Sequence, residues 1–346
     1  MNDHDETHSI ARRRPATIVD VANAAGVAIG TVSRHLNGQA VRSSNRDQIE
    51  RAIADLGFRR NAAAVAMKTR TTHIVGFFVP SLDEFHAAML EELTRKMRTH
   101  GRAVLSYFHD LKVGSIREGL EFFATHRVDA LVVDGEEAIK RQLRPYIDDG
   151  LVVVLYDNDA PGLLADRVFV SNRKSSARIV GHMLELGHRR IATIHGHLID
   201  TAASERLGGY LDAMAAYGIT PEPDLVRDGR WLERNAYDRM RELLALREPP
   251  TAVFAANYNM TLGVLTCLRE QGIRIPQDIS VVSFDDVAAL RLHNPAITSV
   301  AQPIEKLAET ISDIIDARLA DPAAMGRNTV TLDCEILLRE SVRRIA

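Results

Sequence analysis

The 346-residue chain is poor in cysteine and in aromatic residues, and it contains no long apolar run. Its two cysteines, Cys267 and Cys334, lie far apart and show no CxxC spacing, so we expect two reduced, packed thiols. Without a run of about 18 apolar residues, no helix is expected to cross a membrane. The first fifteen residues, MNDHDETHSIARRRP, have no apolar segment, which argues against a secretory signal and favours a cytoplasmic protein.

The sequence also lacks the common catalytic and cofactor motifs. No Walker A loop, no GxSxG, no GxGxxG after the first strand and no helical pair of metal-spaced histidines is found. The pair His195-Gly-His197 has no supporting Cys or carboxylate at metal-ligand spacing, so a strand end followed by a loop is the simpler interpretation. We therefore predict no catalytic residue, no cofactor and no metal site.

The composition, with 46% hydrophobic and 26% charged residues, is that of a globular protein with a sizeable core. The length favours two or three domains. The net charge of −3 is unevenly distributed, because residues 12–70 hold eleven Lys/Arg against four acidic residues. A basic N-terminal end on an acidic remainder is typical of a nucleic-acid-binding head on an unrelated domain.

The segment Thr17 to Asn37, TIVDVANAAGVAIGTVSRHLN, has the pattern of a helix-turn-helix. Thr17 and Asp20 form a capping pair for a first helix, and Gly26 supplies the left-handed turn that ends it. A second helix is predicted over about 29–36 and a third over about 44–56, capped by Gly57. The inward-facing residues should be Val21, Val27, Val32, Leu36, Ile49, Ala52, Ile53 and Leu56.

The second helix would be the DNA-reading helix, with Ile29, Gly30, Ser33 and Arg34 exposed. Ile29 can make only apolar contact with a base, for instance with a thymine methyl group, and Gly30 offers no side chain. Arg34 suits either a base edge or a phosphate.

Beyond residue 73 the sequence alternates short apolar strands with helical stretches. Near-continuous apolar strands of this kind indicate parallel sheets covered on both faces, hence an α/β body. The expected strands are 74–79, 103–108, 129–134, 152–157, 167–171, 190–196, 251–257 and 279–286.

Several motifs resemble the lactose-repressor/galactose-repressor (LacI/GalR) family of bacterial transcription regulators. DVANAAGVAIGTVSRHLN is followed in order by IVGFFVP, LELGHRRIA, SERLGGYLDAM, PTAVFAAN, IPQDISVVSFDD and NPAITSVAQP. The resemblance implies a small all-α helix-turn-helix head and a two-lobed body of the periplasmic-binding-protein type. It divides the chain into a flexible basic tail (1–15), a head (16–58), a hinge (59–72) and a body (73–346) whose chain crosses between lobes near 170, 298 and 328.

By this resemblance, DNA is contacted by the head and by a hinge helix that wedges the minor groove open with Met67, next to Lys68. A plain linker with Met67 packed on the body is the alternative. Ala28 stands where the family usually has Ser as a helix cap, and Arg60 stands where Pro is usual. The predicted DNA-contacting residues are Thr17, Ile29, Gly30, Thr31, Ser33, Arg34, Asn37, Asn61, Met67 and Lys68.

Polar residues follow the expected strands at 157, 172, 257 and 285, where ligands of parallel sheets bind. The resemblance adds Arg206 and a stacking aromatic, Trp231, the only tryptophan. The predicted effector site is Asp157, Arg206, Trp231, Asn257 and Asp285. Strand-end capping or pairing between lobes is the alternative role, notably for Asp157 and Asn172.

These features predict a homodimeric DNA-binding transcription regulator, a repressor, that reads a near-palindromic site. Its DNA affinity would be controlled by a small-molecule effector, a sugar or related metabolite, bound between the lobes. The alternative is a cytoplasmic small-molecule-binding protein or an α/β enzyme without specific DNA binding. The sequence leaves open a tetramer in place of a dimer.

Overall fold

The structure, a computed structural model, describes residues 14–59, 71–321 and 327–345. Internal contacts divide the chain after Thr72 into two units, the head and the body, and each is described by itself. The predicted DNA contacts Asn61, Met67 and Lys68 lie outside the described residues, as do the predicted basic tail up to residue 13 and most of the predicted hinge.

Three helices form the head, and their ends follow the predicted caps. They are α1 (Ile18–Ala24), α2 (Ile29–Leu36) and α3 (Ser43–Leu56). Thr17 and Asp20 make the reciprocal capping box at the start of α1. Gly26 (φ 64°) and Gly57 (φ 59°) adopt the left-handed backbone that turns the chain after α1 and α3.

The head encloses a small core with one departure from prediction. Its fully buried members are Val21, Ala22, Ala25, Val32, Ile49 and Ala52. Leu56 was predicted to face inward, but it is 40% exposed. The correction has a simple cause: Gly57 reverses the chain, so Phe58 packs against the core instead.

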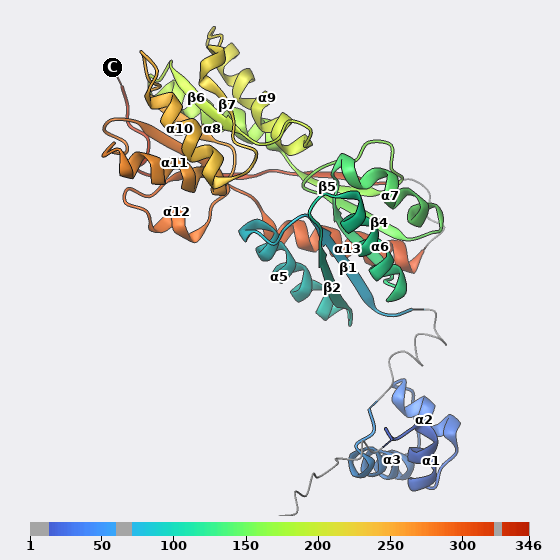
Figure 1. The fold of residues 1–346 in the computed structure, drawn as a ribbon. Helices are drawn as coiled ribbons and strands as arrows, with labels where there is room; N and C mark the ends of the chain where they lie inside the picture. The colour runs from blue at the N-terminus through green and yellow to red at the C-terminus, as the bar shows by residue number, and fades with distance from the viewer. Residues whose placement is uncertain (1–13, 60–70, 322–326, 346) are drawn as a thin grey trace, which may run out of the picture. The chain divides into compact units, whose positions relative to one another are not determined.

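In the described part of the chain, the first lobe of the body is a six-stranded parallel sheet in the order β11-β5-β4-β3-β1-β2. Figure 1 labels β1, β2, β4 and β5 of this sheet. Alternate residues of β1 face opposite sides: Val75, Phe77 and Val79 pack in one core with α5 and α13, and Phe78 packs in another with α6 and α7. The elements are β1 (Ile74–Val79), α5 (Glu84–Thr99), β2 (Ala103–Phe108), α6 (Val113–Thr125), β3 (Ala130–Asp134), α7 (Glu137–Asp148), β4 (Val152–Tyr156), β5 (Asp166–Val170), α13 (Ile304–Ala320) and β11 (Thr329–Leu332).

The second lobe has the strand order β12-β10-β9-β8-β6-β7, parallel except for β12 against β10. Its elements are α8 (Asn172–Glu185), β6 (Ile191–His195), α9 (Thr201–Ala216), the 3-10 turn η1 (Pro223–Leu225), β7 (Val226–Asp228), α10 (Glu233–Leu244), β8 (Ala252–Ala255), α11 (Tyr258–Glu270), β9 (Ser280–Phe284), α12 (Ala288–Leu292), β10 (Thr298–Ala301) and β12 (Glu335–Leu337). Cys267 and Cys334 are buried and unpaired. Among the described helices, none has the length and apolar character that a membrane crossing requires.

The chain passes between the lobes three times. The passages follow β5 at residue 171, β10 at residues 302–303 and β11 at residues 333–334. The short strands β7, β10, β11 and β12 were not expected. Each has three or four residues, too few for a clear hydrophobic pattern.

A buried ion pair joins three separate segments of the first lobe. Asp166, at the start of β5, accepts hydrogen bonds from Nε (2.8 Å) and Nη2 (2.7 Å) of Arg318 on α13. It also accepts one from the backbone N–H of Asn328, just before β11 (2.8 Å). Because the Asp166 carboxylate is nearly inaccessible to water, these donors replace its hydration.

Replacing Arg318 by Met should destabilise the body by about 3 kcal/mol, because the Asp166 carboxylate would stay buried without its cation. Urea unfolding followed by circular dichroism measures the change. The control is Arg274→Met, which breaks the exposed Arg274–Asp278 pair and should leave the midpoint unchanged. Equal effects of the two substitutions would show that the Arg318 pair adds nothing to stability.

Candidate functional site

One pocket in the body is lined by residues from both lobes. Nearly all of them follow the carboxyl ends of strands or begin the next helix, where ligands of parallel sheets bind. The first lobe contributes Pro80, Ser81, Asp83, Phe85, His86, Asp134, Glu136, Asp157 and Asn158. The second contributes Asp200, Arg206, Trp231 and Asn257, with Asp285 and Gln302 after β9 and β10.

The structure brings the five predicted effector residues together in this pocket: Asp157, Arg206, Trp231, Asn257 and Asp285. Asn172, for which ligand contact and structural pairing were both open, does not line it. Its Oδ1 accepts a hydrogen bond from Nε of Arg206 (2.8 Å), so it positions that side chain.

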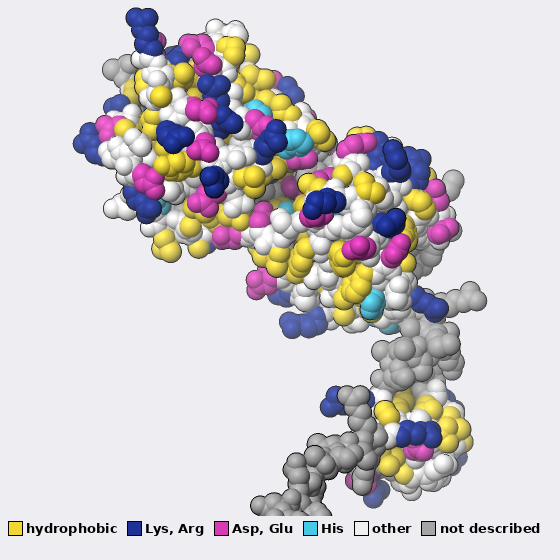
Figure 2. Space-filling view, in the orientation of Figure 1, with side chains coloured by type: hydrophobic (Ala, Val, Ile, Leu, Met, Phe, Trp, Pro, Cys, Tyr) yellow, Lys and Arg dark blue, Asp and Glu magenta, His cyan; other side chains and the backbone are white. Residues whose placement is uncertain are grey.

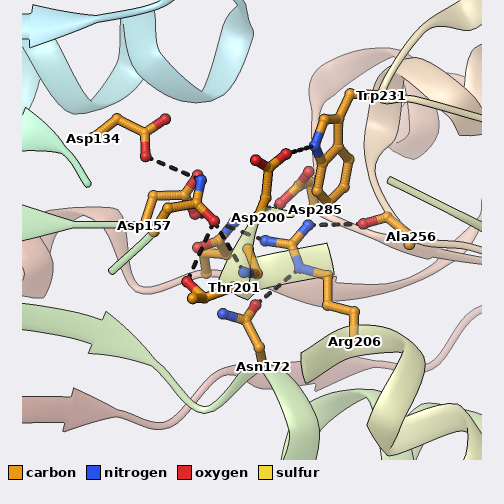
Figure 3. Close-up of polar contacts among 12 residues, drawn as sticks. Asp134, Asp157, Asn172, Asp200, Thr201, Arg206, Trp231, Ala256 and Asp285 are labelled. Atoms are coloured by element: carbon orange, nitrogen blue, oxygen red, sulfur yellow. Dashed lines mark hydrogen bonds and ion pairs between the residues drawn. The ribbon is translucent and has the colours of Figure 1, made fainter. Parts of the chain in front are cut away.

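Arg206 on α9 is held rigidly inside the pocket (Figure 3). Besides its bond to Asn172, its Nη1 donates to the carbonyl oxygen of Ala256 (2.7 Å). Its guanidinium carbon lies 3.7 Å from the ring centre of Phe284 and 5.4 Å from that of Trp231. Nη2 is the nitrogen nearest to Asp157, at 3.9 Å from Oδ1. These contacts fix the orientation of the Arg206 guanidinium in the absence of a ligand.

Trp231 presents its indole ring to the same space. Its Nε1 donates to Asp200 (2.7 Å), as Figure 3 shows. Gly196 lies directly against the ring, because a Cβ added there would be 2.1 Å from Cε2 of Trp231. The indole therefore needs glycine at position 196.

Three of the five predicted residues have a left-handed backbone although none is glycine. The φ angles are 58° at Asp157, 64° at Trp231 and 74° at Asp285. Such backbone is unfavourable for these residue types and persists only where the surroundings impose it, commonly at functional sites. At Asp285 the surroundings include hydrogen bonds from Gln302 Nε2 (2.7 Å) and from the backbone N–H of Tyr258 (3.3 Å).

The sequence interpretation missed an acidic group on the first-lobe wall: Asp83, Asp134 and Glu136, with His86 among them. The hydrogen bond between Asp134 and Asn158 appears in Figure 3. Burial and the carboxylates of Asp134, Asp200 and Asp157 raise the pKa of Glu136 to about 9. Burial and Asp134 raise the pKa of Asp157 to about 7, against the effect of Arg206. One signal was present, since Asp134 is the last residue of an expected strand and Glu136 comes two residues later.

The pKa of His86 responds to the same group. Burial alone would lower it, but Asp134 and Asp83 favour the charged imidazole and raise it to about 10. His195, the first histidine of the His195-Gly-His197 pair, has its Nδ1 2.7 Å from the carbonyl oxygen of Gly196 at the end of β6. It takes no part in this acidic group.

Direct hydrogen bonds link the two lobes beside the pocket. Asn158 Oδ1 accepts from the backbone N–H of Ala202 (2.9 Å), and the N–H of Asp159 donates to Thr201 Oγ1 (2.9 Å). The hydroxyl of Tyr258, at the start of α11, accepts a hydrogen bond from the N–H of Glu84 (2.8 Å). Figure 2 shows the lobes meeting along a hollow on this face of the body.

On the head, α2 exposes Ile29, Gly30 and Arg34, while Thr31 and Ser33 are half-buried. Asn37 follows as the exposed C-terminal cap. Thr17 uses its hydroxyl within the capping box, donating to Asp20 Oδ2 (2.7 Å). As the sequence indicated, Ala28 gives α2 no side-chain cap.

A helix-turn-helix head joined to a two-lobed body with a polar pocket defines the class of ligand-binding transcription regulators. Residues 17–61 match the bacterial regulatory proteins of the lacI family, and residues 180–342 match a periplasmic binding protein-like domain. The chain is 34% identical over 304 residues to the HTH-type transcriptional regulator GalS of Salmonella typhimurium, covering 86% of this chain and 88% of GalS. The chain therefore belongs to the LacI family; it is a DNA-binding transcription regulator and not an enzyme.

Other relatives agree over nearly the full length. The HTH-type transcriptional repressor PurR of Haemophilus influenzae is 28% identical over 334 residues, 95% of this chain and 99% of PurR. The lac repressor dimer bound to operator and the anti-inducer ONPF has the same fold, with a TM-score of 0.85 at 24% identity over 95% of this chain and all of that one. The regulator CelR in complex with cellobiose matches with a TM-score of 0.72 at 28% identity, again over 95% and 100%.

Replacing Ala28 by Ser should stabilise α2 by about 1 kcal/mol, because a serine hydroxyl at this position accepts a hydrogen bond from the first turn. Hydrogen exchange of the α2 amides measures the local gain, and DNA affinity should rise with it. Ala28→Val, which cannot cap, is the control. Faster exchange in the Ser variant than in the wild type would contradict the prediction.

Proposed function

We propose that a small polyhydroxyl metabolite, a sugar or a close relative, binds in the body pocket and controls how tightly the head binds its DNA site. The chain acts in the cytoplasm as a homodimeric repressor on a near-palindromic operator, because a twofold protein suits twofold DNA. The observation that carries this proposal is a pocket lined by both lobes in a chain with a helix-turn-helix head.

The pocket has the chemistry that a hydroxyl-rich ligand requires. Arg206 supplies a fixed donor fork, Asp157 and Asp285 supply acceptors, and Trp231 supplies an apolar face for a sugar ring. Asn257 Oδ1 caps α11 by accepting from the N–H of Met260 (2.9 Å), so its NH₂ group is the part left for a ligand. That CelR was solved with cellobiose supports a carbohydrate.

The coupling between sites would act through the lobes. The links Asn158–Ala202 and Glu84–Tyr258 close the pocket directly, so a ligand that bridges the walls shifts the balance between lobe arrangements. DNA affinity then changes by the difference in ligand affinity between the two arrangements, tenfold for about 1.4 kcal/mol.

At the DNA, we propose that α2 lies in the major groove. Ile29 and Ser33 would face base edges, with Thr31, Asn37 and Thr17 near the backbone; Arg34 suits a base edge or a phosphate. Gly30 lets the helix approach closely but reads no base. Asn61, Met67 and Lys68 would extend the contact into the minor groove, which moves part of the specificity to DNA shape.

The test is selection of random double-stranded DNA by the full-length chain, followed by fluorescence anisotropy on the enriched sequence. We expect a near-palindromic site bound far more tightly than unrelated DNA, with an affinity that falls steeply as salt rises. A chain that enriches no sequence would instead be a small-molecule-binding protein without a specific DNA site.

In Trp231→Ala, effector should no longer change the affinity for operator. Without effector, the variant should bind operator within about twofold of the wild-type affinity. The reason is that Trp231 belongs to the pocket and not to the head. Effectors are first found by thermal shift against sugars, sugar phosphates and nucleosides, since a ligand of the folded state raises its melting temperature.

Two glycine variants sharpen this test. Gly196→Ala places a methyl group 2.1 Å from the indole and should displace Trp231, with the same loss of response. Gly181→Ala, on α8 with no neighbour within 4 Å, should change nothing. If the Trp231 variant bound operator more weakly but kept its effector response, the pocket assignment would be wrong.

A further inference from the structure

Three side chains on the first-lobe wall form a cluster that the proposed function does not use, although one of them, Asp157, was named there as an acceptor. They are His86 at the start of α5, Asp134 at the end of β3 and Asp157 after β4. Each offers one ligand atom, and these atoms all lie within 4.8 Å of one another. His86 is only 6% exposed, yet its Nε2 has no hydrogen-bond partner, and neither has Asp157 Oδ1.

The neighbours of the cluster orient these atoms toward one another. His86 Nδ1 lies 2.8 Å from Asp83 Oδ1, and that oxygen also accepts from the backbone N–H of His86 (2.9 Å). Nδ1 of His86 donates to a carboxylate, and a metal ion that displaces the proton from Nε2 would complete the arrangement seen around metal-binding imidazoles. Asn158 Nδ2 binds Asp134 Oδ1 (3.0 Å), which leaves Oδ2 for the cluster.

The spacing suits a metal ion better than a direct contact. Nε2 of His86 and Oδ2 of Asp134 are 3.6 Å apart, which is too long for a hydrogen bond. Two ligands of a tetrahedral ion at about 2.1 Å are roughly 3.4 Å apart. No metal-ligand spacing is visible in the sequence, because the three residues lie at or after the ends of three different strands, β1, β3 and β4.

The charges around the cluster also favour a cation. Asp83, Glu136 and Asp200 line the same pocket, and among the described residues that line it Arg206 is the only Lys or Arg. Arg206 Nη2 stays 3.9 Å from Asp157 Oδ1, and its other nitrogens donate to Ala256 and Asn172. Only His86 and Arg206 offset these buried carboxyl groups, so a divalent ion would relieve the repulsion that remains.

We propose that His86, Asp134 and Asp157 bind one divalent metal ion of the zinc, manganese or cobalt type, with Asp83 as a positioning residue for His86. An imidazole with two carboxylates is a donor set that suits these ions rather than calcium. Three protein ligands leave coordination positions for oxygens. This step rests on the proposed function: the open coordination positions would bind two adjacent oxygens of the effector, as a vicinal diol or a 2-hydroxy acid offers.

The test uses the full-length chain, stripped with a chelator and dialysed against Zn²⁺, Mn²⁺ or Co²⁺ alone. We expect one ion per chain that is lost, with affinity at least tenfold weaker, in Asp134→Asn and Asp157→Asn. Asp83→Asn should weaken binding by a smaller factor than either of these variants does. His4 and His8 in the sequence can take ions of their own, so the site is defined by the difference between wild type and Asp134→Asn.

The single tryptophan gives a second readout, because Trp231 lines the same pocket. Paramagnetic Co²⁺ should quench its fluorescence in the wild type and not in Asp157→Asn. The matched control is Asp200→Asn, which removes a pocket carboxylate outside the cluster and should keep the ion; it is read by the number of bound ions, because Asp200 accepts the hydrogen bond of Trp231 Nε1.

Two results would overturn the proposal: ion binding equal in wild type and Asp134→Asn, or a loss in Asp200→Asn as large as in the cluster variants. The second would mean a diffuse effect of charge. Operator binding by the metal-stripped chain is measured in parallel. Because that binding depends on the head, its presence or absence tests the proposed function separately from the metal site.

Discussion

The pocket depends on the burial of one permanent positive charge, the guanidinium of Arg206. An isolated buried cation would be strongly unfavourable, so the protein surrounds it with acceptors and ring faces. The Ala256 carbonyl and Asn172 fix two of its nitrogens, and Phe284 lies against its plane. These partners come from strands and helices of the second lobe, so the fork is rigid in that lobe, while Asp157 of the first lobe stands 3.9 Å away. That longer gap is where a ligand can join the two lobes.

The two walls of the pocket differ in kind. The second-lobe wall is extensively hydrogen-bonded: Trp231 to Asp200, Asp285 to Gln302, and Arg206 to its carbonyl and amide, with Gln302 Oε1 left without a hydrogen bond among the described residues. On the first-lobe wall, His86 Nε2 and Asp157 Oδ1 accept or donate no hydrogen bond among the described residues; Asp134 lies 3.6 Å from the first and Arg206 3.9 Å from the second. Buried polar atoms without a hydrogen bond are unfavourable, so a ligand that bonds to them gains the most free energy. A response to effector therefore depends chiefly on what the first-lobe wall recognises.

The caps, the long strands and three pocket residues, Asp157, Asn257 and Asp285, could be predicted because each has a local cause. Thr17 and Asp20 are three residues apart, Gly26 and Gly57 occupy left-handed turns, and the long apolar strands follow simple periodicity. Arg206 and Trp231 came only from resemblance to a family. Leu56 was misplaced because the inward direction at the end of α3 depends on the turn at Gly57, which puts Phe58 in its place. The short strands β7, β10, β11 and β12 had too few residues to give a pattern.

By itself, the sequence determined the helix-turn-helix head, the parallel α/β body and the edge of the sheets at which polar residues gather. These follow from period, capping and the rule that parallel strands end on one side. Only the tertiary structure decided that His86 meets Asp134 and Asp157, that Gly196 makes room for Trp231, and that Asn158 links the lobes. The physical reason is that such contacts join β-α units distant in sequence, and the packing of the sheet sets their distances.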